Sequence, residues 1–212
     1  MRRLQLIIVP LLAYALAVPV SRATERQQWN FRVLLDGREI GEHRFTLTTE
    51  GANRQLRSAA RLAVRLLFID AWRYQHRADE IWQGDCLRSL NARTRTNGNT
   101  EQVHAETRDG RLLVNRPGEQ RQLAGCIQSF AYWNPSILGA RALLNSQTGE
   151  LQDVQITRLG AEDLTVRGAS MPTLRYRISA PAMQIDLWYA GERWVALESL
   201  VKGDRLLRYE LS

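Results

Sequence analysis

The stretch WNFRVLLDGREIGEHRFTLTTEG, residues 29–51, indicates the fold class of this chain. Two runs rich in aromatic, β-branched and alternating polar residues flank the dipeptide Asp36-Gly37. Asp-Gly between extended runs is a strong hairpin signal, because both residues accept the positive φ angles of a two-residue turn. We therefore expect one strand from Trp29 to Leu35 and a second strand that ends near Thr49.

The same pattern continues to the C-terminus and predicts a mainly β protein. Strand-like runs are separated by further turn signals, at Asn97-Gly98, Asp109-Gly110, Ala190-Gly191 and Gly203-Asp204. Residues 57–67 would suit a helix by composition, yet we expect them to be extended, since a strand pattern follows directly. Short strands with regular turns predict a single antiparallel sheet, strongly curved into an open or closed barrel.

One α-helix is expected, over residues 135–144. Asn134 is a favourable N-cap, and Pro135 suits the first helical position because its missing N–H would be unpaired there anyway. The residues that follow are apolar almost all round, which is typical of a covered helix. Asn145 can end the helix in the left-handed conformation. We expect this helix to cover the concave face or the mouth of the sheet.

The N-terminus has the pattern of an export signal. Arg2 and Arg3 precede an apolar run, and Ser21 and Ala23 provide small residues for cleavage after about Ala23. A retained membrane anchor is the alternative, which Pro10 and Pro19 disfavour. We therefore expect a cleaved signal peptide over residues 1–23, a single β-rich domain over 24–212 and a periplasmic location, without an integral membrane segment after cleavage.

Charge and cysteine content restrict the possible partners. The formal net charge is +7, and Lys202 is the only lysine among 29 basic residues. The arginines are dispersed among acids rather than clustered, so nucleic-acid binding is not expected. Cys86 and Cys126 are the only cysteines, and in an oxidising compartment an even count favours a disulfide over a redox pair, which would present as Cys-x-x-Cys.

The stretch WRYQHRADEIW, residues 72–82, contains the best candidates for a site. With period two, one strand face carries three large aromatic residues together with His76 and Glu80. Such a face is typical of a cavity with a few polar groups, in which a buried Glu80 would have a raised pKa and could act as acid or base with His76. The alternative is structural: Glu80 pairs with an arginine and His76 bonds a backbone carbonyl.

Other chemistries find little support. His43 and His104 lie on separate predicted strands, and no metal-binding spacing is present. No Gly-x-Ser-x-Gly elbow and no glycine-rich phosphate loop occurs, so we expect neither a cofactor nor a metal.

Four segments together resemble a known family. They are LDGREIG at 35–41, YQHRADEIWQGDCL at 74–87, FAYWNPSILGARALLNSQTGEL at 130–151 and IDLWYAGERWVALES at 185–199. The chain is similar in these segments to the exported bacterial domain-of-unknown-function family 6134, which implies a compartment but no catalytic residues. The order of hairpins is more distantly similar to periplasmic lipoprotein-carrier half-barrels, which implies a helix over a concave sheet with acyl chains bound between them.

From these observations we expect a periplasmic, non-catalytic binding or carrier protein for a lipid or another apolar molecule. An envelope enzyme using Glu80 and His76, or an assembly protein that pairs through a sheet edge, remain the alternatives. The oligomeric state stays open. The residues expected to bind the ligand are Trp72, Tyr74, His76, Glu80, Trp133, Leu138 and Trp188.

Overall fold

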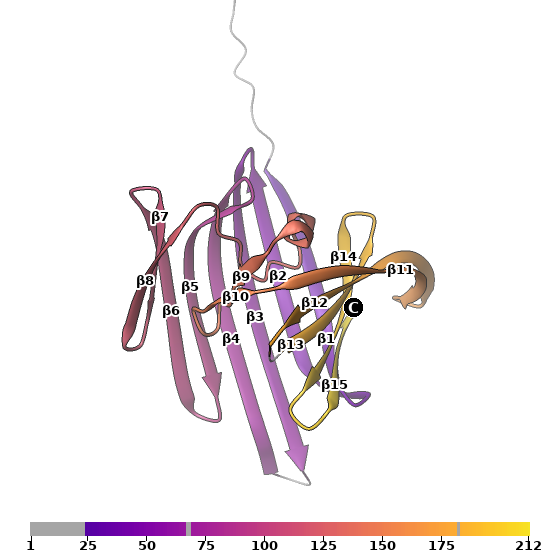
Figure 1. Ribbon diagram of the computed structural model, residues 1–212. Coiled ribbons are helices and arrows are strands. Elements are labelled where there is room, and N and C mark those ends of the chain that lie inside the picture. Colours follow the sequence, from indigo (N-terminus) through magenta and orange to yellow (C-terminus); the bar gives the residue numbers. More distant parts are fainter. Residues whose placement is uncertain (1–23, 67–68, 182) are drawn as a thin grey trace, which may run out of the picture.

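The computed structural model describes residues 24–66, 69–181 and 183–212. The expected signal peptide, residues 1–23, lies outside this part of the chain. Thirteen of the described strands form one antiparallel sheet (Figure 1). They are β1 (Glu25–Leu35), β2 (Arg38–Glu50), β3 (Asn53–Leu66), β4 (Ile69–Gln83), β5 (Cys86–Thr96), β6 (Asn99–Arg108), β7 (Arg111–Arg116), β8 (Glu119–Ala124), β11 (Gln155–Val166), β12 (Ala169–Ala180), β13 (Met183–Ala190), β14 (Arg193–Val201) and β15 (Arg205–Leu211).

The sheet is open. Strands β1 to β8 follow one another as a meander, and β15 pairs with β1, so that β11 and β8 become the two edges. Figure 1 shows that the sheet is curved and that these two edges do not meet. The concave side of the sheet is called the hollow. The prediction of one strongly curved antiparallel sheet is thus confirmed in its open form.

The Asp36-Gly37 turn is found as predicted. Asp36 and Gly37 have φ of 49° and 78°, the left-handed values that a primed two-residue turn requires. Trp29 faces Phe45 across the β1–β2 pair. Residues 57–67 are extended as expected as far as Leu66, where β3 ends, while residue 67 lies outside the described part.

The crossing segment, residues 125–154, carries the chain from β8 to β11. It contains a short 3-10 helix, η1 (Pro135–Gly139), and the two-stranded β9 (Ala142–Leu144) and β10 (Leu151–Asp153). Figure 1 shows it lying within the curve of the large sheet. Its buried side chains belong to the same apolar core as the inner faces of the strands; they are Ala131, Trp133, Ile137, Leu143 and Leu144.

The predicted α-helix over 135–144 is wrong, because these residues form a short 3-10 helix followed by a strand. Its start is as expected, because Asn134 is extended and its side chain accepts from the Ser136 N–H at 3.3 Å. The helical turn then ends at Gly139, and the next residues extend as β9, in which Leu144 pairs with Leu151. The run is apolar because it is enclosed by the sheet, and burial of this kind does not distinguish helix from strand.

The Cys86–Cys126 disulfide is present in the structure. It joins the first residue of β5 to the start of the crossing segment, with the two Cα atoms 4.9 Å apart. Next to it, the Leu87 N–H donates to the Ile127 carbonyl at 2.8 Å. The bond therefore ties the covering segment to the sheet it covers. In the described part of the chain, no helix has both the length and the hydropathy to cross a bilayer.

Gly41 allows two neighbouring strands to approach each other closely. Its φ is +144°, and a Cβ built there would lie 2.0 Å from the carbonyl oxygen of Arg61 on β3. That oxygen is backbone, so it cannot move aside without shifting β3.

We predict that Gly41→Ala lowers the free energy of unfolding by roughly 2 kcal/mol or more, because it adds both a clash and a strained φ. Urea denaturation followed by circular dichroism measures the loss. Gly139→Ala is the matched control, since nothing lies within 4 Å of its added Cβ. Equal effects of the two substitutions would contradict the argument.

Candidate functional site

The inner face of β4 is the one that the period-two pattern predicted. His76, Ala78, Glu80 and Trp82 are buried, Trp72 and Tyr74 are half-buried, and the residues between them are exposed. Neighbouring strands add their own inward residues in register, for instance Leu56 of β3 opposite Glu80. The inward side chains therefore change along β4: Trp72, Tyr74 and His76 lie near its start, and Glu80 and Trp82 lie near its end.

An aromatic ladder lies at one end of this face. The rings of Trp72 and Tyr74 stack with centroids 5.7 Å apart, and Tyr74 stacks on His76 at 6.4 Å. His76 accepts or donates a hydrogen bond at Thr94 Oγ1, 2.9 Å from Nδ1, and not at the backbone carbonyl that the structural alternative expected. Three of the predicted ligand-binding residues thus form one continuous surface.

His43 extends this surface across to β2. Its Nε2 lies 2.7 Å from Ser58 Oγ and its Nδ1 lies 3.2 Å from the Tyr209 hydroxyl. Burial lowers the pKa of His43 to about 3, with a smaller contribution from the charge of His76, and burial lowers the pKa of His76 to about 4. Both imidazoles are consequently neutral near pH 7 and act as hydrogen-bonding groups rather than as cations.

Glu80 lies further along the same strand and is buried. Its carboxylate accepts from Trp82 Nε1 at 2.9 Å and faces Ser129 Oγ of the crossing segment at 3.3 Å. Burial raises the pKa of Glu80 to about 7, against the opposing effect of these two hydrogen bonds. Within residues 24–66, 69–181 and 183–212, no arginine pairs with Glu80 as the structural alternative expected. Glu80 instead links the sheet to the segment that covers it.

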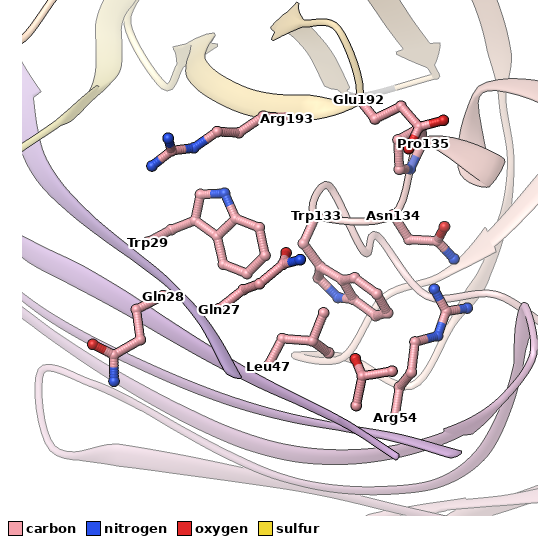
Figure 2. A pocket seen from close by; sticks show the side chains of 11 residues that line it. Gln27, Gln28, Trp29, Leu47, Arg54, Trp133, Asn134, Pro135, Glu192 and Arg193 are labelled. Atoms are coloured by element: carbon pink, nitrogen blue, oxygen red, sulfur yellow. The ribbon is translucent and has the colours of Figure 1, made fainter. Parts of the chain in front are cut away.

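A pocket of about 540 Å³ opens at the other end of the hollow, where β1 begins (Figure 2). Its walls come from the start of β1, the end of β2, the start of β3, the crossing segment and the β13–β14 turn. It is lined by Gln27, Gln28, Trp29, Leu47, Thr49, Arg54, Trp133, Asn134, Pro135, Glu192 and Arg193. Of the predicted ligand-binding residues, only Trp133 lies in this wall.

Trp133 is held in place from two sides. The guanidinium of Arg54 lies 4.7 Å above its ring centroid, and the Trp82 ring meets it edge-on at 5.5 Å. Arg54 also donates to Asp85 at 2.9 Å, and Asp85 accepts from the Asn134 side chain at 3.1 Å. The hydrogen bond from Asn134 is the largest cause that holds the pKa of Asp85 below its usual range. The joint at Asn134 is thereby fixed to the β4–β5 turn.

Two donors in this pocket lack a partner. The indole N–H groups of Trp29 and Trp133 are buried, and neither has a hydrogen-bond acceptor among the described residues. An unpaired buried N–H costs about 1–3 kcal/mol. The arrangement therefore suits a bound group that brings an acceptor. Sequence reasoning missed Trp29, Arg54 and Arg193, because their strands meet at this end only after the sheet has curved.

The remaining predicted residues lie elsewhere. Leu138 is half-buried against the core in η1 and lines neither the pocket nor the aromatic ladder. Trp188 of β13 donates to the Glu162 carboxylate of β11 and lies under the Arg175 guanidinium, 4.7 Å from its ring centroid. Its neighbour Tyr189 reaches inward to the crossing segment, so Trp188 points to the opposite face of the sheet.

The three histidines do not converge. His43 and His76 are neighbours, with ring centroids 6.5 Å apart, whereas His104 is exposed on β6. Among the residues that the structure describes, no group of three or more histidine, cysteine or carboxylate side chains could hold a metal ion.

Comparison with known proteins concerns family and fold. Residues 31–212 match the family model DUF6134, described as a domain of unknown function. No curated protein matches the chain. The chain is similar to the crystal structure of a beta-barrel-like protein of domain of unknown function DUF1849 from Brucella abortus, with a TM-score of 0.67 and 10% identity, covering 90% of this chain and 97% of that chain. At such low identity the likeness concerns the fold alone.

Glu80 predicts a distinctive pH dependence of stability. Its pKa rises from an ordinary 4.5 to about 7 on folding. Between these values the folded protein keeps a proton that the unfolded chain releases. The free energy of unfolding therefore falls as pH rises, by about 3 kcal/mol in all, and levels off above about pH 7.

Glu80→Gln should remove this fall in the free energy of unfolding. The stability of the variant relative to the wild type should therefore increase from pH 5 to pH 7.5. Urea denaturation at a series of pH values measures it, and the buried histidines contribute equally to both proteins. Asp79→Asn is the control, because Asp79 is exposed on the other face of β4. A difference that does not change with pH would refute the assignment.

Proposed function

The chain belongs to the DUF6134 family, a domain of unknown function, and we propose that it is a non-catalytic binding or carrier protein for a lipid or another molecule with an apolar part. The observation that carries this proposal is the pocket between Trp29 and Trp133, in which two buried indole N–H groups have no acceptor among the described residues. Export to the periplasm belongs to the same proposal, and the Cys86–Cys126 disulfide is compatible with it.

The size and composition of the pocket support a small amphipathic ligand. Its volume of about 540 Å³ falls within the range of about 300–1,000 Å³ that small-molecule sites occupy. Trp29, Leu47, Trp133 and Pro135 supply apolar surface, and the other lining residues are polar or charged. Figure 2 shows the Gln27 side chain between the two tryptophans. A wall that combines apolar surface with polar groups suits a ligand that has both an apolar part and a polar head.

The half-buried aromatic ladder adds a second apolar surface at the other end of the hollow. Trp72, Tyr74 and Tyr209 are each partly exposed there, although aromatic rings of this size are usually well covered in a core. A carrier protein needs apolar surface that stays accessible, because its ligand must enter and leave.

The acid/base alternative has less support in the geometry. Glu80 and His76 stand four residues apart on one strand, roughly 13 Å along the chain, which is beyond direct proton transfer. Each bonds to a different partner, Glu80 to Trp82 and Ser129 and His76 to Thr94. Both carboxyl and imidazole are 4% exposed, which leaves little room for a substrate beside them.

Binding can be tested with a fluorescent fatty acid and with native mass spectrometry after mild extraction. Thr49→Trp should lower the affinity at least tenfold, because Thr49 lines the pocket and the larger ring would fill it. Thr48→Trp is the matched control, since Thr48 precedes it on β2 and points to the opposite face.

The proposal requires that the wild type binds the probe and that only Thr49→Trp weakens it. It fails if no apolar probe binds the folded protein. It fails equally if both tryptophan substitutions leave the affinity unchanged, because binding would then lie outside this pocket.

A further inference from the structure

We infer that the pocket selects ligands with an anionic oxygen head, a carboxylate or a phosphate ester, and this inference rests on the proposed binding function. The inference concerns the head group of a ligand bound between Trp29 and Trp133. It rests on three observations: two buried indole N–H groups are unpaired, an indole can only donate, and a positive charge beside them is not offset by an acid.

Among the described residues, the buried indole N–H groups that have no acceptor both belong to this pocket. Three other buried tryptophans all donate to an acceptor: Trp82 to Glu80, Trp188 to Glu162 and Trp194 to the Ala196 carbonyl. Trp29 and Trp133 are equally buried, at 3% and 5% exposure, yet have no acceptor among the described residues. Both line the same pocket. The buried indole N–H groups of the described residues are therefore paired except at this pocket.

An indole N–H can only donate a hydrogen bond. In Figure 2 the nitrogen edge of Trp133 faces Gln27 and Leu47, and that of Trp29 faces the side of the pocket where Arg193 lies. A guanidinium is likewise a donor without acceptor capacity. A bound group must therefore bring several acceptor positions, and an ionised carboxylate or phosphate has the most.

The local charge also favours an anion. The guanidinium of Arg54 is offset by Asp85, with which it forms an ion pair at 2.9 Å. Arg193 has no hydrogen bond or ion pair with any described side chain. Glu192 is the one acid in the pocket lining, and Figure 2 shows its carboxylate beside Pro135, away from the two indoles. The indole side of the pocket therefore carries the uncompensated positive charge of Arg193.

A ligand with a neutral head group should bind this pocket with lower affinity. An alcohol or a carbonyl could accept from one or both indoles, but it would gain nothing from the Arg193 charge. Hydrogen bonds to charged groups are roughly twice as strong as those between neutral groups. We therefore expect ligands that share one alkyl chain to be ranked by the charge of the head.

The experiment compares decanoate, decyl phosphate, decanol and decyltrimethylammonium on the full-length protein, by displacement of the fluorescent fatty acid. We expect decanoate, decyl phosphate or both to bind at least tenfold more tightly than decanol and the cation. The carboxylate and phosphate arms separate the two possible sources of an anionic head. Raising the salt concentration should weaken the anions and leave decanol unchanged.

Variants locate the effect. Arg193→Gln, at the exposed first residue of β14, should lower the affinity for the preferred anion by roughly tenfold and leave that for decanol unchanged. Trp133→Phe, which keeps a ring but lacks the N–H, should lower the affinity for the preferred anion by roughly tenfold and that for decanol by less, because a hydrogen bond to a charged group is the stronger one. Trp188→Phe is the matched control, because it removes an indole N–H outside the pocket. Circular dichroism confirms that each variant is folded.

The possible failures are distinguishable. If decanol binds as tightly as both anions, the inference is overturned while the binding function stands. If no probe binds the folded wild type, the proposed function itself fails and the inference fails with it. If the anions are preferred but Arg193→Gln and Trp133→Phe have no effect, the selectivity does not come from this pocket and the inference is wrong.

Discussion

An apolar concave face that the sheet cannot cover by closing on itself is the constraint on which the rest of this structure depends. Among the described strands, β8 and β11 are the two edges of the large sheet, so this sheet does not close over its own concave face. The crossing segment seals it instead, because its apolar side chains join the core that the strands present. The crossing segment must leave one edge of the sheet, pass across the concave face and reach the other edge within about thirty residues. Extended chain advances further per residue than helix does, so a partly extended segment spans this path more readily.

Specific bonds fix this irregular segment to the sheet, since most of its backbone hydrogen bonds join parts of the segment to one another. The disulfide holds its start, the Glu80 carboxylate meets Ser129 a few residues later, and Asn134 binds Asp85. Each of these contacts leads back to β4, β5 or the turn between them. The wall of the pocket that contains Trp133 is thus rigidly attached to one half of the sheet, while the wall that contains Arg193 belongs to the other half.

Local patterns in the chain were enough to predict the hairpins, the extended conformation of residues 57–66 and the inward face of β4. These features depend on neighbours two or three residues away, through turn dihedrals and the alternation of side chains. The helix was mispredicted because an enclosed apolar run looks the same whether it coils or extends. Of the residues expected to bind a ligand, Trp72, Tyr74 and His76 form one surface, whereas Trp188 lies on the opposite face of the sheet and Leu138 lies outside both the pocket and this surface.

From residue order one can infer a mainly β chain, the two cysteines available for a bridge and a strand that combines aromatic rings with a glutamate and a histidine. The tertiary structure decided which residues those side chains contact. The curvature of the sheet brings Trp29, Arg54, Trp133 and Arg193 to one pocket although they are spread over 164 positions of sequence. No local rule couples such distant residues, because their proximity depends on the summed bend and twist of many strands. Whether an indole finds an acceptor or is left to donate to a ligand is settled only by that packing.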